Sequence, residues 1–313
     1  MGNNDVARHA VSRERLEKSF GDMGVRVQAR FDHVYERGWP MRVMMEELGC
    51  ELLDHVAARS VQDPDLASER TRLALTTAAE CLFGVLEMGC CPEGDWEIPF
   101  PLTQTRLTSE EKDYDEMRDA TDTVTARTWV EAFNICVASG LVWDWERVFG
   151  LLLRSDYAPM LHKSLPHAKR DSVSEPADLA HMDTLCLYLT PARGHLPRDW
   201  PQVPLHMPSM DERLDAALAL DAAGARSPDQ KLLRILLRDD QPSFEQALRE
   251  RLEEHRAGVG GDPAPRSLLP LGAIALAALA VQVHGWNLQT TSGYLPAALL
   301  NAPATANDPA RTR

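Results

Sequence analysis

The chain has 313 residues, 44% of them hydrophobic and 26% charged, so it is long enough and apolar enough to bury a sizeable core. Lys and Arg number 33 against 47 Asp and Glu, and the resulting net charge of −14 argues against direct binding of nucleic acid or of an anionic membrane. A basic protein partner suits this charge, although acidity can also serve solubility alone.

The cysteines and the N-terminus together indicate the cellular compartment. The six cysteines show no CxxC pair and no spacing typical of a disulfide framework. The N-terminal stretch MGNNDVARHAVSRERLEKSF lacks the apolar core of a signal peptide. We therefore expect a cytoplasmic protein with reduced thiols, while the oligomeric state stays open.

Apolar residues recur at intervals of three and four along the N-terminal part of the chain, which is typical of amphipathic helices. The pattern predicts one helix over 12–36 and a second over 41–56. Asp63–Pro64 matches an N-cap followed by a proline at the first helical position, and it predicts the start of a third helix. Prolines accompany Trp96 in the stretch 91–107, which indicates a surface loop and a possible boundary within the domain.

The remaining helices are predicted from their start and stop signals. Thr108 and Glu111 have the spacing of a capping box, and the core-like WVEAFNICVA stops at Ser139–Gly140. Pro176 opens another helix, and a proline-rich loop spans 191–208. Three later helices begin with capping-box spacing: Ser209 with Glu212, Ser227 with Gln230, and Ser243 with Gln246.

The longest apolar run, LLPLGAIALAALAVQV over 268–283, carries no charge and places apolar residues on every side of a helix. A helix of this kind has to be packed on all sides, so we expect it at the centre of the fold. Gly285 follows at the position where a helix commonly ends in left-handed backbone.

No stretch shows the period-two alternation of a half-buried strand between turn residues. The sequence therefore predicts an all-α fold, a multi-helix array of antiparallel helices around the apolar C-terminal helix. We expect a single domain over 12–301 and disordered tails at 1–11 and 302–313.

The familiar catalytic and nucleotide-binding motifs GxSxG, GxxxxGKS/T, GxGxxG and HExxH do not occur. Helical bundles can nevertheless bind metal ions between carboxylates and histidines of facing helices. The candidate ligands are Glu51 with His55, Asp178 with His181, and Glu250 and His255, which lie with Glu254 near the end of a later helix. Such spacing is common among surface pairs on any helix, so a metal site is the minor interpretation and no cofactor is expected.

The most acidic stretch of the chain, 110–122, is a candidate for docking a basic partner. Its acids are Glu110, Glu111, Asp113, Asp115, Glu116, Asp119 and Asp122. They exceed what stabilisation of a helix start requires, so docking of a basic partner competes with the commoner interpretation, a solvated helix face. Trp143 and Trp145 are further candidates, because an exposed Trp could anchor such a partner.

Four stretches resemble a known family. TWVEAFNICVASGLVWDWERVFGLLL (128–153) joins a core helix, a polar turn and another apolar helix. PSFEQALRERLEEHRAG, LGAIALAALAVQVHGW and SGYLPAALL then follow in that order within 242–300. This order is similar to that of the immunity protein 49 family, and the resemblance covers roughly 125–300 with gaps. The proline-rich stretch 164–208 departs from the family pattern.

The resemblance implies an all-helical immunity protein of a bacterial polymorphic toxin system. Such a protein binds a cognate toxin domain inside the producing cell and blocks it, without being an enzyme, and no functional residue transfers by motif. Two other interpretations stay open: a helical, di-iron-like enzyme of bacterial specialised metabolism, and a scaffold or regulatory module that binds peptides in its grooves. An adjacent toxin gene would favour the first interpretation, whereas stoichiometric iron and biosynthetic neighbours would favour the enzyme.

Overall fold

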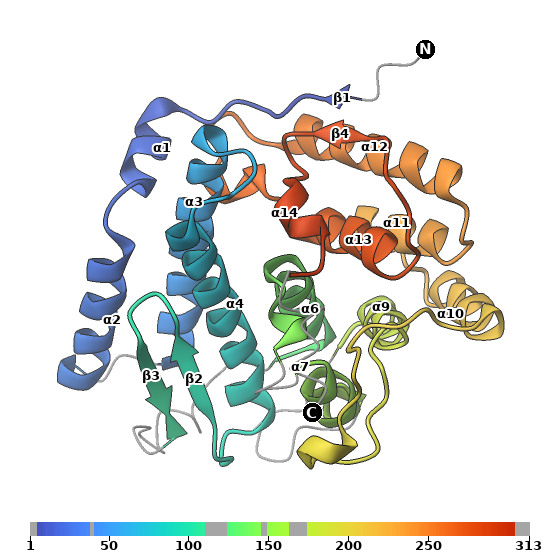
Figure 1. Ribbon diagram of the computed structural model, residues 1–313, viewed down its shortest axis with the longest axis horizontal. Coiled ribbons are helices and arrows are strands. Elements are labelled where there is room, and N and C mark those ends of the chain that lie inside the picture. The colour runs from blue at the N-terminus through green and yellow to red at the C-terminus, as the bar shows by residue number, and fades with distance from the viewer. Residues whose placement is uncertain (1–4, 38–40, 110–123, 145–148, 163–173, 304–313) are drawn as a thin grey trace.

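Helices dominate the structure, and strands are confined to two short pairs within the part that is described (Figure 1). The structure is a computed structural model that describes residues 5–37, 41–109, 124–144, 149–162 and 174–303. The predicted all-α fold class is therefore confirmed.

The predicted first helix is divided in two. Helix α1 (Arg13–Ser19) ends before Gly21, and α2 (Met23–Arg37) begins after Asp22. The carboxylate of Asp22 accepts a hydrogen bond from the backbone N–H of Gly24 at 2.9 Å, so it satisfies a donor at the new helix start. The local capping by Asp22 thus interrupts an apolar periodicity that continues across the break.

Helices α3 (Met41–Gln62) and α4 (Glu69–Cys90) pack along one another and form a large part of the N-terminal core. The prediction that Asp63–Pro64 caps the third helix is wrong, because α4 begins after Ser68. Asp63 instead accepts a hydrogen bond from the backbone N–H of Ser68 at 3.1 Å. This bond closes a loop in which Leu66 turns into the core with a positive φ of 49°.

The stretch 91–107, predicted to be a surface loop, contains most of an antiparallel hairpin. Strands β2 (Glu97–Phe100) and β3 (Thr105–Thr108) pair, and their apolar side chains alternate inwards onto α4. Ile98 lies so close to Gly84 of α4 that a Cβ on this glycine would lie 2.6 Å from its Cδ1 atom. The loop interpretation is corrected by this close packing, which depends on a glycine far away in the sequence.

Helix α6 (Ala126–Ser139) crosses the middle of the molecule and contacts α4, α9 (Pro176–Cys186) and α13 (Leu271–Gln282). Its side chains include the fully buried Trp129 and Phe133, whose rings stack 5.3 Å apart. It ends as predicted, with Gly140 in left-handed backbone at φ 79°. The centre of the fold is therefore shared between α6 and the C-terminal helix.

After α6 the chain forms shorter elements. They are the 3-10 turn η2 (Leu141–Trp143), α7 (Phe149–Leu151), the π-helical η3 (Leu152–Tyr157), α8 (Ala158–His162) and α9 (Pro176–Cys186). The proline-rich 191–208 contains one turn, η4 (Pro197–Asp199), and it is held to the body by a bridge between Leu189 and Leu205.

Helices α10 (Met210–Ala222) and α11 (Pro228–Leu236) begin with the two predicted capping boxes. The third capping box is wrong, because α12 (Gln241–Gly258) begins two residues before Ser243, directly after Asp240. The hydroxyl of Ser243 donates to the Asp240 carboxylate instead of accepting from the backbone. Spacing alone does not reveal which of two neighbouring polar residues caps a helix.

The apolar C-terminal run forms the 3-10 turn η5 (Pro265–Leu268) and helix α13 (Leu271–Gln282), and Gly285 follows with φ 71° as predicted. Every residue from Ala273 to Ala280 is buried. Stretches including α4 and α13 are long and apolar enough to cross a membrane, but 78% and 67% of their windows are buried inside the structure, as in core helices. The prediction of a helix packed on all sides is confirmed.

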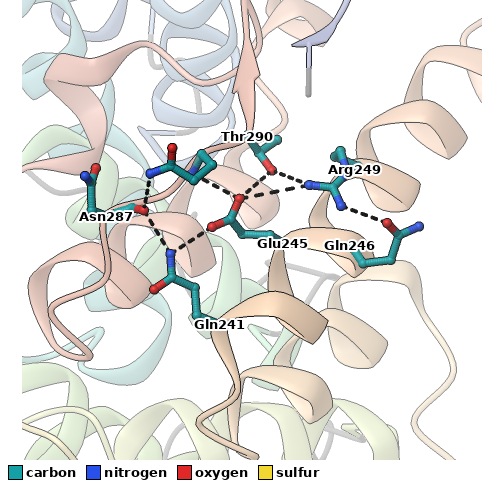
Figure 2. A network of polar contacts seen from close by, with 7 residues as sticks. Gln241, Glu245, Gln246, Arg249, Asn287 and Thr290 are labelled. Carbon is teal, nitrogen blue, oxygen red and sulfur yellow. Dashed lines mark hydrogen bonds and ion pairs between the residues drawn. The ribbon is translucent and has the colours of Figure 1, made fainter. Parts of the chain in front are cut away.

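A buried carboxylate secures the chain segment that follows α13 (Figure 2). Glu245 of α12 accepts from the backbone N–H of Gln289 at 3.0 Å and from the Thr290 hydroxyl at 3.2 Å. Its other oxygen accepts from the Gln241 side chain at 2.8 Å, and the same amide also donates to the Asn287 carbonyl. The network fixes the segment 287–290 against α12.

The chain ends differ from the expected tails. Strand β1 (Asp5–Val6) pairs in parallel with β4 (Thr291–Ser292), and the side chain of Val6 is buried. The N–H of His9 donates to the Tyr294 hydroxyl at 2.8 Å. The structure therefore holds residues 5–9 against the C-terminal part, before α14 (Ala297–Leu300). Most of the expected C-terminal tail, 304–313, lies outside the described residues.

Candidate partner-binding surface

The acidic stretch proposed from the sequence lies outside the part of the chain that the structure describes, and so does Trp145. The affected acids are Glu110, Glu111, Asp113, Asp115, Glu116, Asp119 and Asp122. Their role in docking a basic partner remains a prediction from sequence.

Trp143 is half-buried at the end of η2 and packs against the core. Its ring nitrogen Nε1 donates to the side-chain oxygen of Gln282 at 3.0 Å, and the amide nitrogen of Gln282 donates to the Leu300 carbonyl. Trp143 thereby joins η2 to the ends of α13 and α14. This contact gives it a structural role and leaves only part of its ring open to a partner.

The candidate metal ligands on α3 and α9 either contact other residues or, in the case of His181, are buried. Glu51 forms an ion pair with Arg30, and the Nδ1 atom of the buried His55 donates to the Ser19 carbonyl at 2.8 Å. Asp178 accepts from the Gln230 amide. Burial lowers the pKa of His181 to about 4, against the weaker opposing effect of the nearby Asp229 and Asp178.

The third pair lies on α12 and is divided between different neighbours. Glu250 accepts from the Gln246 amide at 2.7 Å, whereas His255 donates through Nε2 to the Ser267 carbonyl at 2.7 Å. Across the described ranges, no three His, Cys, Asp or Glu side chains are grouped as metal ligands would be. The structure therefore does not bring the three sequence-predicted pairs together.

A polar cavity of about 490 Å³ lies between the α1–α2 turn and the facing ends of α3 and α4. Both acids in its wall already have partners: Asp22 pairs with Arg70 at 2.6 Å, and Asp63 accepts from the Ser68 backbone. Arg59 lies over the Phe20 ring, 5.0 Å from its centroid. These contacts account for the charged groups of the wall, so the cavity indicates no particular ligand.

A different surface stands out on α10, at the outer edge of the molecule between α9 and α11 (Figure 1). Met210, Leu214 and Leu218 are 73%, 60% and 58% exposed. Their spacing of four residues places them on one face of the helix. The buried residues of the helix, Ala216, Ala217 and Leu220, lie on the adjoining side, and Ala217, three residues after Leu214, borders the row.

Charges lie beside this apolar row. Asp211 and Asp215 are exposed, and each directly follows one of the apolar residues in the sequence. Two further charged side chains of the helix form ion pairs within the protein: Asp221 pairs with Arg234 at 3.0 Å, and Arg213 pairs with Asp239 at 3.3 Å. The exposed face of α10 thus combines an apolar row with two acids for which no ion pair is found among the described residues.

The sequence analysis identified the capping box of α10 but missed this face. The available signal was the four-residue spacing of Met210, Leu214 and Leu218. Such a row is normally interpreted as a core-facing stripe, because most large apolar stripes are buried. Only the tertiary arrangement shows that here the row is exposed, while Ala216, Ala217 and Leu220 beside it are buried.

Comparison with known proteins supplies the family. The model of the family described as Immunity protein 49 matches residues 63–299. No curated protein and no solved structure gives a significant match. The family match begins before the region that carries the resemblance in the sequence, and it includes the proline-rich stretch that departs from the pattern. The chain therefore belongs to the immunity protein 49 family.

Proposed function

We propose that this protein binds a cognate bacterial toxin domain and neutralises it through protein–protein contact. The observation that carries the proposal is the family match over residues 63–299, which includes α6, α13 and the whole helical C-terminal half. Binding would take place in the cytoplasm of the producing cell, before the toxin leaves it.

Charge supports a basic partner. The net charge of −14 creates a field that accelerates encounter with a positively charged domain and discourages acidic ones. The exposed apolar face of α10 would supply the centre of the interface, because the core of a stable interface is usually apolar. Together these features suit an inhibitor that associates quickly and then dissociates slowly.

Co-expression of the protein with candidate toxin domains, taken from the genes that neighbour the gene for this chain, tests the proposal. The protein should restore growth to cells that express one of these domains, and the two purified proteins should form a stable complex in calorimetry. A toxin domain from an unrelated locus, at the same expression level, is the matched control. Absence of both growth rescue and binding would contradict the proposed function.

The acidic stretch 110–122 should contribute to the encounter rate. Replacing Asp113, Asp115, Glu116 and Asp119 by Lys should slow association at low salt, because it reverses the local field. The difference from the parent should shrink as the Debye length falls to about 8 Å at physiological ionic strength. Surface plasmon resonance at two salt concentrations measures both rates, and an unchanged association rate would exclude this stretch from docking.

A further inference from the structure

We propose that the exposed face of α10, formed by Met210, Leu214 and Leu218 with Asp211 and Asp215 beside them, is the surface on which the toxin domain docks. The inference deepens the proposed function and rests on it. The interface would lie on α10, and the surface of the toxin domain that fits it would be an apolar patch flanked by Lys or Arg.

Clustering distinguishes this face from the other exposed apolar residues. Elsewhere among the described residues, large exposed apolar side chains are valines of α2 and α3 and residues of the 191–208 loop. On α10, three side chains at least 58% exposed follow one another at single-turn intervals. The row extends over roughly 12 Å of helix, which is enough to fill a groove on a partner.

The face does not serve the fold. Helix α10 buries Ala216, Ala217 and Leu220 against the protein, whereas Met210, Leu214 and Leu218 remain exposed to solvent. A contiguous row of this kind on a surface is typical of an interaction site. We infer that its apolar side chains are covered by another protein.

Helix α10 is held in place by contacts within the protein before any partner binds. Arg213 is largely buried and pairs with Asp239 in the turn after α11, while Arg234 of α11 forms a two-pronged pair with Asp221. At the helix start the Ser209 hydroxyl accepts from the backbone N–H of Glu212 at 3.3 Å, and the Glu212 carboxylate accepts from the backbone N–H of Ser209 at 2.8 Å. A surface held in this way loses little conformational entropy on binding, which favours affinity.

The charges on α10 favour a basic partner over a second copy of this chain. Helix α10 carries four carboxylates and one guanidinium, and that guanidinium is already paired within the protein. A second copy of this chain in two-fold contact would bring Asp211 and Asp215 of both copies close together, which is repulsive. A basic toxin surface instead gains attraction from the same acids, so it is the occupant that the chemistry favours.

The main test removes the apolar row and keeps the charges. The triple variant Met210→Ala, Leu214→Ala, Leu218→Ala should bind the toxin domain that the parent neutralises at least about 100-fold more weakly, mainly through faster dissociation. The matched control, Val25→Ala with Val61→Ala, removes apolar groups that are also exposed but lie on α2 and α3. It should bind as the parent does, and both variants should melt like the parent.

A second pair of variants tests the charges. Asp211→Lys with Asp215→Lys should slow association, most strongly at low salt, whereas Glu253→Lys with Glu254→Lys on the exposed part of α12 should do so much less. Hydrogen exchange of the parent complex should show new protection in α10.

The outcomes separate the two proposals. If the parent does not bind the toxin domain at all, the proposed function fails and the inference fails with it. If the parent binds but the triple variant binds equally well, only the location on α10 is overturned. Light scattering that shows a dimer of the parent and a monomer of the triple variant would assign the face to self-association and also overturn the inference.

Discussion

Helices α13 and α10 are both rich in Leu and Ala, yet one is buried and the other lies at the edge of the molecule. In α13 every residue from Ala273 to Ala280 is buried, and the helix has no charged residue. In α10 the buried positions are confined to Ala216, Ala217 and Leu220. The apolar composition of a helix therefore does not determine how much of it the fold covers.

Charge placement explains the difference. A helix without charges can be surrounded by other elements, and the small residues of α13 permit a close approach. A Cβ on Gly272 would lie 2.2 Å from a carboxylate oxygen of Asp229, at the start of α11. The acids of α10 require water on one side, and Met210, Leu214 and Leu218 are exposed on the same side.

The largest effect is expected in α13. Leu276→Asp should destabilise the protein by more than about 4 kcal/mol, because it leaves an unpaired carboxylate in an apolar core. Leu276→Met nearly conserves volume and should cost less than about 1.5 kcal/mol. Urea unfolding followed by circular dichroism measures both variants. A Leu276→Asp variant as stable as the parent would contradict the central position of this helix.

The next largest effect is expected in the Glu245 network, which fixes the segment 287–290 against α12. Glu245→Ala leaves the donors of Gln241, Gln289 and Thr290 without their acceptor, which should cost about 3 kcal/mol. Gln246→Ala, one residue later on the exposed side of α12, should change stability by no more than about 0.5 kcal/mol. Equal unfolding midpoints for the two variants would show that the buried network contributes nothing.

Helix α9 packs against both α6 and α10, and its buried His181 makes this layer sensitive to acid. Burial lowers the pKa of His181 from its ordinary value of 6.5 to about 4, so the unfolded chain takes up the proton first as pH falls. The stability that the neutral ring supplies is present above the unfolded pKa and is lost as pH falls towards the folded one. Between pH 7 and 5 the loss should be about 2 kcal/mol.

The change His181→Gln tests this effect by removing the titrating group. Stability of the variant, measured by denaturant unfolding at several pH values, should fall less steeply than that of the parent over this window. His195→Gln, at an exposed position of the 191–208 loop, is the matched control for the replacement of a histidine by glutamine and should be as stable as the parent at pH 7. Parallel curves for the parent and His181→Gln would refute the assignment.

Those features of the fold that depend on contacts between neighbouring residues were predictable from the sequence. The capping boxes at Ser209 and Ser227 and the glycine stop at Gly140 involve only neighbouring residues, and all three are confirmed. The all-α class followed from the same periodicity. The hairpin at 97–108 was missed because its burial depends on Ile98 fitting against Gly84, a contact that no local pattern reveals.

The candidate site was less predictable, for a similar reason. Residues spaced as Glu51 and His55 can coordinate a metal only if other helices bring further ligands to them, and here they bind Arg30 and Ser19 instead. The exposure of Leu214 depends on which elements do not cover α10. Sequence periodicity shows that residues share a face but not whether that face meets the core or the solvent.

The smallest effect on stability is expected within α10, where two leucines provide an internal comparison. Leu218 is 58% exposed and Leu220, two residues later, is 1% exposed. Leu218→Gln should change the free energy of unfolding by no more than about 0.5 kcal/mol, since it removes little buried surface. Leu220→Gln should cost about 3 kcal/mol, because it loses apolar burial and places an amide in the core. Denaturant unfolding of both variants measures the difference. If they are equally destabilised, the apolar row of α10 is packed against the protein, and its availability to a partner is refuted.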